Sequence, residues 1–167
     1  MDIQKVLQGV PLFSDALTQD QLGDLAARAG TVEFEPGSAI FHEHEPGTTM
    51  YVIVDGSVVI TIDDGAGKRS VATLTQGSIF GEISLLTGLP RLGTVTAEGK
   101  VEAIEITKAM LEPILAGAPK LYDRLATLLQ KRQSDLDQIV DPGYWNKVER
   151  SRENLSKVMR RHFGEAQ

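Results

Sequence analysis

The chain has 167 residues, a length typical of one domain with a buried core. Its hydrophobic fraction of 41% and charged fraction of 24% are those of an ordinary globular protein. The absence of cysteine excludes disulfides, thiolate metal sites and cysteine nucleophiles, and it fits a reducing, cytoplasmic location. A net charge of −6 argues against general affinity for nucleic acid or anionic membranes. We expect no nucleic-acid partner and no membrane-spanning segment, since no apolar run is long enough.

An N-terminal helical segment is predicted over residues 1–30. Thr18 and Gln21 have the spacing of a capping box, in which a hydroxyl and an amide side chain satisfy free backbone groups of the first turn. Leu22 and Leu25 follow at helical spacing, and Gly30 marks the expected end of this helix.

Residues 31–106 are predicted to form antiparallel β structure. Most of the 16 glycines lie in this part of the chain and separate short runs rich in Val, Ile, Thr and Phe. Short strands at that spacing indicate a sandwich or barrel. The predicted strands include residues 50–54, 57–62, 70–74, 94–97 and 101–106, with a hairpin loop at 63–67.

Helices are expected again after the β region. Thr107 is a candidate cap for one helix, and Pro119 suits the first turn of the next. From residue 121 to 139 an apolar stripe steps by three or four and is interrupted by Arg132. We therefore assign residues 107–140 to C-terminal helices and residues 141–167 to a helical tail with a helix over 144–163.

The segment from Phe80 to Val95 carries the most chemistry. A strand is expected to end at a glycine and continue into a short helix, whose free amides suit a phosphate. Arg91 adds a guanidinium fork that matches phosphate oxygens, and Ser84 adds a hydroxyl. Glu82 would repel a phosphate, so it should face a donor such as a sugar hydroxyl. Together these groups describe a site for a ribose cyclic phosphate.

This segment resembles the phosphate-binding cassette of the cyclic-nucleotide-binding domain family. The pattern is matched at ten of the sixteen positions from 80 to 95, and the resemblance extends over about residues 10–140. The matching residues are Phe80, Gly81, Glu82, Ile83, Ser84, Leu85, Leu86, Arg91, Thr94 and Val95. The resemblance implies an α+β fold that is mainly β: an eight-stranded antiparallel, jelly-roll-like β-roll with N-terminal helices, a cassette helix and C-terminal lid helices.

The resemblance also implies roles for individual residues. Arg91 would pair with the cyclic phosphate, aided by backbone amides near Ser84 and by the amide or hydroxyl of Thr94. Glu82 and the backbone of Gly81 would hold the ribose 2′-hydroxyl. The other residues of the predicted site are Phe80, Ile83 and Leu92 in the cassette, Ala72 and Leu74 on the base side, and Arg132 as a lid residue touching the base.

Leu92 and Gly93 depart from the small or hydroxyl residues that usually follow the arginine in the family. A threonine directly after the arginine often accompanies cGMP recognition in relatives, so Leu92 favours cAMP over cGMP as the regulatory ligand. We expect no other cofactor.

Several residues also have an alternative interpretation in which their role is structural and not in ligand binding. Glu82 and Arg91 can be read as an ordinary loop ion pair, and Arg132 as a residue that extends to solvent. His42 and His44 share a strand face but lack a third ligand, so no metal site is expected. Tyr144 and Trp145 can be read as packing residues or as an aromatic cap over the base. The basic tail fits a surface for a partner or membrane as well as a solvated helix.

The sequence does not identify which protein or process this domain regulates. The 27 residues after Val140 are too few for a helix-turn-helix domain, and kinase inhibitor segments and membrane helices are not evident. The chain resembles the cytosolic domain of bacterial cyclic-nucleotide-gated or mechanosensitive-type channels, which leaves a channel fragment and a stand-alone sensor as alternatives. A degenerate domain that serves assembly is a third. No histidine lies near Ser84 in sequence, so an enzyme is not expected. Homo-oligomer or effector contacts are expected through the C-terminal helices.

Overall fold

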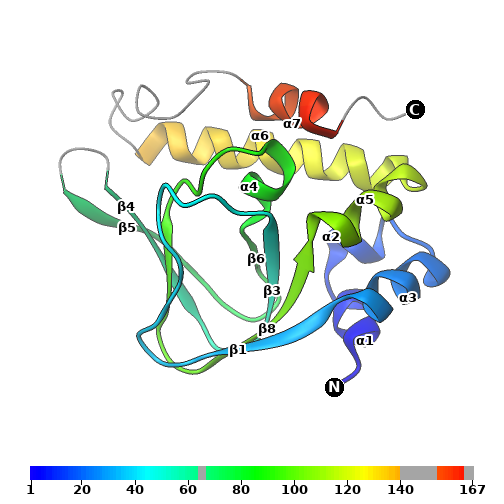
Figure 1. Ribbon diagram of the computed structural model, residues 1–167, viewed down its shortest axis with the longest axis horizontal. Coiled ribbons are helices and arrows are strands. Elements are labelled where there is room, and N and C mark those ends of the chain that lie inside the picture. Colours follow the sequence, from blue (N-terminus) through cyan, green and yellow to red (C-terminus); the bar gives the residue numbers. More distant parts are fainter. Residues whose placement is uncertain (64–66, 140–153, 164–167) are drawn as a thin grey trace.

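The computed structural model describes residues 1–63, 67–139 and 154–163 (Figure 1). Helices from the N-terminus lie at one side of a pair of β-sheets, and a long helix from the C-terminal part runs across one end of the sheets (Figure 1). This arrangement places the cassette segment between the sheets and the long helix.

Three helices precede the sheets: α1 (Ile3–Gln8), α2 (Pro11–Ser14) and α3 (Gln19–Arg28). The capping box is confirmed, because the Gln21 amide donates to Thr18 Oγ1 at 3.1 Å and the Thr18 amide donates to Gln21 Oε1 at 2.9 Å. The helix ends at Arg28, two residues earlier than predicted, because Ala29 is already extended and Gly30 begins the first strand.

The eight strands in the described ranges form two four-stranded antiparallel sheets, with the orders β1-β8-β3-β6 and β2-β7-β4-β5. Their bounds are β1 (Gly30–Phe34), β2 (Ala39–Phe41), β3 (Thr49–Asp55), β4 (Val58–Asp63), β5 (Lys68–Leu74), β6 (Ile79–Phe80), β7 (Thr94–Ala97) and β8 (Val101–Thr107). The predicted mainly β class with flanking helices and the predicted eight-stranded roll are confirmed, and the two sheets remain separate rather than closing into one barrel.

The hairpin between β4 and β5 follows the predicted pattern. Asp63 pairs with Lys68, so the chain reverses between them, although residues 64–66 lie outside the described part. Along β4, Val58 and Ile62 are buried and Asp63 is exposed. One face of this strand therefore points toward the interior.

Four more helices occur in the part of the chain that the structure describes: α4 (Glu82–Thr87), α5 (Lys108–Ala116), α6 (Pro119–Ile139) and α7 (Leu155–Phe163). Thr107 caps α5 by accepting the Met110 amide at 3.3 Å, as predicted. The predicted helix over 144–163 is found from Leu155, and its first part lies outside the described residues. No helix in the described ranges is both long and apolar enough to cross a bilayer.

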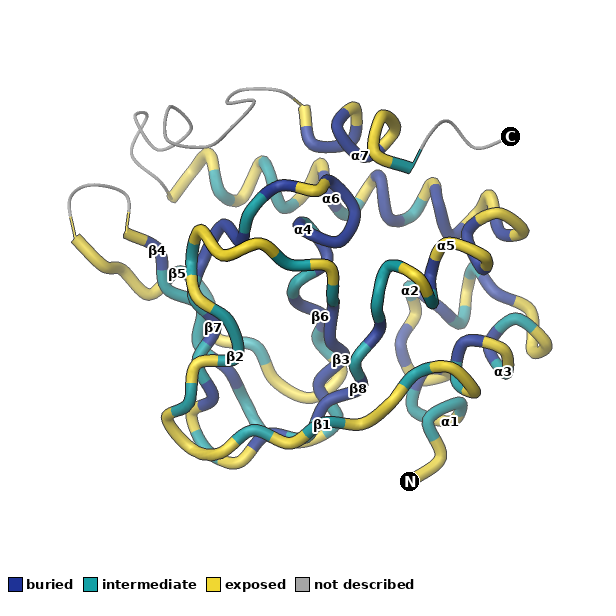
Figure 2. The backbone as a smooth tube through the Cα atoms, in the orientation of Figure 1, coloured by how far each residue is buried: buried dark blue, intermediate teal, exposed yellow. Residues whose placement is uncertain are grey.

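The interior contains two apolar clusters. The larger joins the N-terminal helices with α4, α5 and α6, and the smaller lies between the sheets around Tyr51, Phe80 and Val101. Helix α4 lies among the most buried parts of the fold (Figure 2), with Leu85 and Leu86 fully buried. The cassette helix is therefore held by packing on several sides.

Candidate functional site

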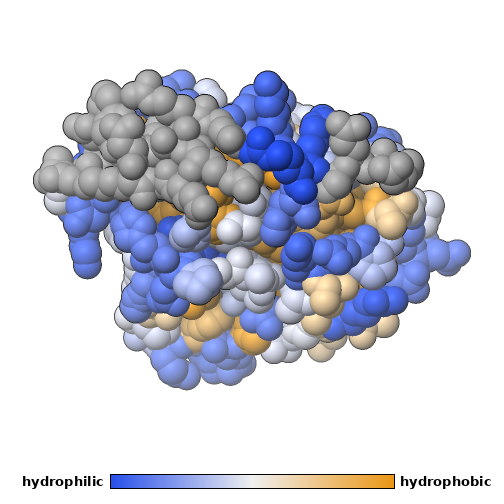
Figure 3. All heavy atoms as spheres, turned by 45° about the horizontal axis from the view of Figure 1, so that its top comes forward, coloured by the Kyte–Doolittle hydropathy of each residue, from blue (hydrophilic) through white to orange (hydrophobic). Residues whose placement is uncertain are grey.

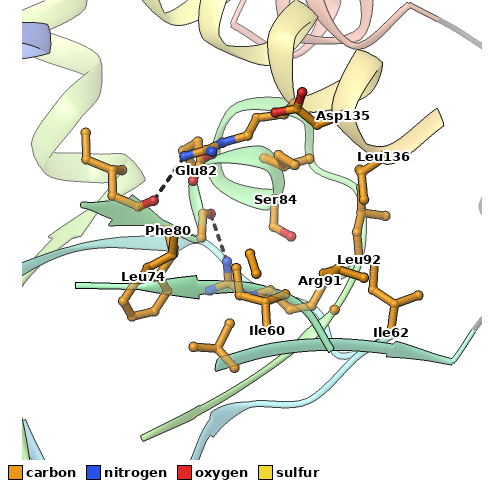
Figure 4. Close-up of a pocket in the computed structure, with 18 of the residues that line it drawn as sticks. Ile60, Ile62, Leu74, Phe80, Glu82, Ser84, Arg91, Leu92, Asp135 and Leu136 are labelled. Atoms are coloured by element: carbon orange, nitrogen blue, oxygen red, sulfur yellow. Dashed lines mark hydrogen bonds and ion pairs between the residues drawn. The ribbon is translucent and has the colours of Figure 1, made fainter. Parts of the chain in front are cut away.

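A cavity of about 300 Å³ opens between the second sheet, α4 and the end of α6 (Figure 4). Ten of the eleven residues predicted for the site line it, and these are Ala72, Leu74, Phe80, Gly81, Glu82, Ile83, Ser84, Arg91, Leu92 and Arg132. Segments separated by up to sixty residues in the sequence thus meet at one cavity.

Thr94 is the predicted site residue that does not line the cavity. Its hydroxyl accepts a hydrogen bond from the Glu43 amide at 2.9 Å. In this structure Thr94 therefore ties the loop after β2 to β7, and its neighbours Gly93 and Val95 contribute to the cavity wall instead.

Arg91 is buried, with only 4% of its surface exposed. Its Nη1 donates to the carbonyl oxygens of Thr49 at 3.0 Å and Gly81 at 2.9 Å, and Nη2 donates to Thr49 Oγ1 at 2.8 Å. The Phe41 ring lies 3.9 Å from the guanidinium carbon, which adds a cation–π contact. These contacts hold the planar guanidinium in one orientation at the cavity.

No carboxylate in the described ranges forms an ion pair with Arg91, although the group is a buried cation. Burial lowers the pKa of Arg91 from its ordinary value, and the fields of Tyr51, Glu82 and Glu45 oppose that shift. An arginine keeps its proton in proteins, so this site carries a fixed positive charge that protein anions do not neutralise at contact distance.

A chain of hydroxyl groups continues behind Arg91. Thr49 Oγ1 donates to the Tyr51 hydroxyl at 3.2 Å, which in turn donates to Glu105 Oε2 at 3.1 Å. The pKa of Tyr51 is raised, chiefly by burial and partly by the charge of Glu105. Both hydroxyl groups therefore stay protonated, and they link the acceptor of Arg91 to a carboxylate on β8.

Two glycines allow the backbone to approach Arg91. A Cβ atom at Gly47 would lie 2.2 Å from Arg91 Nε, well inside any possible contact. Gly81 has a φ of 86° and would place a Cβ atom 2.9 Å from the Thr49 carbonyl oxygen. Each glycine is thus required by the position of the guanidinium or of its acceptors.

Glu82 does not pair with Arg91, so the reading of these two residues as an ordinary loop ion pair is wrong. The carboxylate of Glu82 is 2% exposed and accepts from Arg132 Nε at 2.7 Å. Arg132 Nη2 also donates to the Ile79 carbonyl oxygen at 3.1 Å. Arg132 therefore joins α6 to the first turn of α4, and its partner in this structure is a cassette carboxylate.

The remaining wall is mainly apolar. Ile62, Leu74, Leu92 and Leu136 lie around the space into which the Ser84 hydroxyl points, and Asp135 lies at the α6 side (Figure 4). Sequence reasoning did not assign the following residues to the site: Phe41, Ile60, Ile62, Val71, Ile79, Gly93, Val95, Asp135, Leu136, Gln138 and Ile139. The predicted strand over 57–62 was a signal for Ile60 and Ile62, and the apolar stripe over 121–139 was a signal for Leu136, whereas Phe41 and Asp135 had none.

The other candidate residues lie away from this cavity or outside the described ranges. His42 Nδ1 is 3.2 Å from Glu45 Oε1, and His44 Nε2 is 3.7 Å from Glu43 Oε2. No group of three metal-binding side chains occurs in the described ranges. Tyr144 and Trp145 fall among the residues that are not described.

The ion pair between Glu82 and Arg132 yields a stability prediction. We expect Arg132→Ala to lower the free energy of unfolding by about 2 kcal/mol, because it leaves a buried carboxylate without its cation. This is below the cost for a fully buried pair, since Arg132 is 29% exposed. In urea denaturation, Glu82→Gln combined with Arg132→Ala should cost less than the sum of the single changes.

Arg124→Ala is the matched control, because Arg124 also lies on α6 but pairs with Asp15 at an exposed position. It should change stability by less than about 0.5 kcal/mol. Strictly additive effects of the Glu82 and Arg132 changes would contradict a coupled pair.

The sequence model of the "Cyclic nucleotide-binding domain" family matches residues 31–117, just over half of the chain. A cAMP-dependent protein kinase regulatory subunit of Yarrowia lipolytica is 37% identical over 113 residues, which cover 65% of this chain and 29% of the relative. A cyclic nucleotide-gated channel beta-3 of Canis lupus familiaris is 30% identical over 143 residues, which cover 82% of this chain and 18% of the relative.

Among solved structures, a regulatory subunit of a cAMP-independent protein kinase A from Trypanosoma cruzi bound to guanosine superposes with a TM-score of 0.66. It is 26% identical, and the match covers 84% of this chain and 44% of that one. This chain spans less than half the length of the first curated relatives that it matches. On the family match and the site geometry together, the chain belongs to the cyclic-nucleotide-binding domain family.

Proposed function

We propose that the chain is a regulatory sensor domain that binds cAMP in preference to cGMP in the cavity between the second sheet, α4 and α6. One observation carries this proposal: Arg91 is a buried cation that lines the cavity and has no carboxylate partner in the described ranges. A ligand phosphate supplies the missing negative charge. The fixed cation also explains how an acidic protein of net charge −6 holds an anion.

The cyclic phosphate lies against Arg91 and Ser84. The guanidinium is already oriented by Thr49 and Gly81, so little side-chain freedom is lost when the anion binds. The buried Ser84 hydroxyl and the backbone amides near it donate to the remaining phosphate oxygens. In this proposal Thr94 acts indirectly, through its hydrogen bond to the Glu43 amide.

The ribose lies beside Glu82 and Gly81. One oxygen of the Glu82 carboxylate accepts from Arg132, and the carboxylate retains acceptor capacity for the 2′-hydroxyl. A ligand lacking that hydroxyl would leave this buried acceptor unsatisfied, which is costly. The site is therefore proposed to discriminate ribose from 2′-deoxyribose.

The base lies against the apolar wall formed by Ala72, Leu74, Leu92 and Leu136. Leu92 supplies no hydroxyl to a purine edge, which favours adenine over guanine. Arg132 is proposed to act on the base side only through α6, because its guanidinium already holds Glu82 and the Ile79 carbonyl.

A cGMP-selective site is the second candidate, and Asp135 is the observation that favours it. Its carboxylate lines the cavity from α6 and can accept hydrogen bonds from guanine N1 and N2. Tighter binding of cGMP than of cAMP, with the preference lost in Asp135→Asn, would establish this alternative. The guanosine in the trypanosomal structure contains no phosphate, whereas Arg91 favours a ligand that does.

The proposed mechanism is a change in the balance between open and closed positions of α6. Ligand contacts to the cassette and to the underside of α6 favour the closed position, and binding and release leave the nucleotide unchanged. The protein acted on can be a channel to which this chain is attached, an effector protein or a second copy of the chain contacted through the C-terminal helices. A cytoplasmic location is part of the same proposal.

The first test is calorimetry with cAMP and cGMP. We expect measurable binding of both and tighter binding of cAMP. Arg91→Ala should weaken the affinity at least thirty-fold, because truncating one partner of a buried charge pair costs about 2 kcal/mol or more. Arg28→Ala, at an exposed position at the end of α3, is the matched control and should bind as wild type does. A domain that serves assembly alone would give no heat with either nucleotide, and that result would overturn the proposal.

A second test changes the position of Arg91 and not its identity. Gly47→Ala introduces a methyl group 2.2 Å from Arg91 Nε, so the guanidinium must move. We expect cAMP affinity to fall at least tenfold, and the melting temperature to fall as well, since the displaced guanidinium gives up hydrogen bonds to Thr49 and Gly81. Gly99→Ala is the control, because nothing lies within 4 Å of the added carbon. Equal affinities for the two variants would refute the role of Arg91.

A further inference from the structure

Helix α7 packs against both the cassette helix α4 and the lid helix α6 (Figure 1). Leu155, Val158 and Met159 are each at most 1% exposed. Leu155 and Met159 belong to the same apolar cluster as Leu85 and Leu86 of α4, and the lid residues Leu125 and Leu129 also belong to it. The apolar face of α7 is thus part of the main core.

Polar and ring contacts fix both ends of α7. At its start the Leu155 amide donates to Gln133 Oε1 of α6 at 2.9 Å. At its end the His162 ring lies against Gly88, the residue that ends α4, so that a Cβ atom at Gly88 would be 2.8 Å from His162 Cε1. Phe163 lies 5.3 Å from Lys108 Nζ at the start of α5. The helix therefore has one defined position across α4 and α6.

The sequence left two interpretations of the basic C-terminal segment, a surface for a partner or membrane and a solvated helix. The position of α7 bears on both for the described residues. The outward face of α7 is polar, with Lys157, Arg160 and Arg161 exposed, and strongly hydrophilic atoms cover this side of the molecule with hydrophobic atoms visible beside them (Figure 3). The apolar face is covered by the protein's own core. A membrane or partner can therefore reach that apolar face only after α7 leaves α4 and α6.

We propose that the outer surface of α4 and α6 is a docking surface for α7, and that docking of α7 and binding of nucleotide strengthen each other. The nucleotide part of this inference rests on the proposed function. The physical reason is that docking of α7 and binding of nucleotide both require α6 to lie close to α4. Nucleotide lies between α4 and the inner side of α6, whereas α7 joins α4 to α6 from the outer side. Any separation of α6 from α4 loses contacts on both sides.

Coupling of this kind is reciprocal. If docked α7 tightens nucleotide binding by some factor, bound nucleotide stabilises docked α7 by the same factor. α7 then converts occupancy of the cavity into a change at the surface of the domain, 16 residues or more beyond the last residue that lines the cavity. Transient undocking, which is more frequent without nucleotide, exposes Val158 and Met159 together with the outer face of α4.

The first experiment uses the full chain without nucleotide. Met159→Asp places a charge at a fully buried position of α7, and Lys157→Asp places the same side chain at an exposed position two residues away. By amide hydrogen exchange, we expect Met159→Asp to increase exchange at least tenfold in α7, in α4 and in the second half of α6. Lys157→Asp should leave α4 and α6 as in wild type. Faster exchange in α7 alone, with α4 and α6 unchanged, would overturn the proposal.

The second experiment adds cAMP. We expect the nucleotide to slow exchange in α7 of the wild-type protein, and Met159→Asp to weaken cAMP binding about tenfold, within the usual range for coupling between sites. Lys157→Asp should bind as wild type does. Unchanged affinity in a Met159→Asp protein whose α7 exchanges freely would overturn the coupling.

The two proposals fail in different ways. If wild type binds neither nucleotide, the proposed function is wrong. The link between α7 and α4 is still tested in that case, by the hydrogen exchange measured without ligand. A stop codon after residue 153 serves as a second variant, because it removes α7 without introducing a buried charge. Its melting temperature shows whether the rest of the chain stays folded, and it should reproduce the exchange pattern of Met159→Asp.

Discussion

The site depends on one constraint, which is that Arg91 is a cation buried without a contacting anion. Removing a charge from water is expensive unless hydrogen bonds and an opposite charge replace the solvent. Here two carbonyl oxygens, one hydroxyl and the face of Phe41 provide only neutral acceptors. The positive charge of Arg91 at the cavity is therefore not neutralised by a contacting anion. Much of the local structure supports the position of its guanidinium.

That support reaches well beyond the cassette. Gly47 and Gly81 leave the space in which the guanidinium and its acceptors lie. The Thr49 hydroxyl accepts a hydrogen bond from Arg91 and donates one to the Tyr51 hydroxyl, which in turn donates to Glu105 on β8. The first sheet thus holds the guanidinium in place, which is what the proposed anion site requires of a preorganised binding group.

The second important interaction is between Glu82 and Arg132. It links the cassette to α6 across fifty residues of sequence, so the position of α6 depends on the geometry of a buried carboxylate. Because α7 contacts the other side of the same two helices, the cassette is held between a ligand cavity and a surface helix. In the mechanism that we propose, occupancy of the cavity is transmitted over this short, continuous set of packed contacts.

The sequence alone determined the class of the fold and the capping residues Thr18 and Thr107, and it predicted an anion site in the segment from Phe80 to Arg91. These properties are local, since they depend on residue type and spacing along one stretch of chain. Tertiary structure decided that Glu82 pairs with Arg132 and not with Arg91, and that Phe41 and Asp135 line the cavity. It also decided that the apolar face of α7 is covered by α4 and α6. Such pairings join residues far apart in the chain, and spacing carries no information about which of several possible partners packing brings within reach.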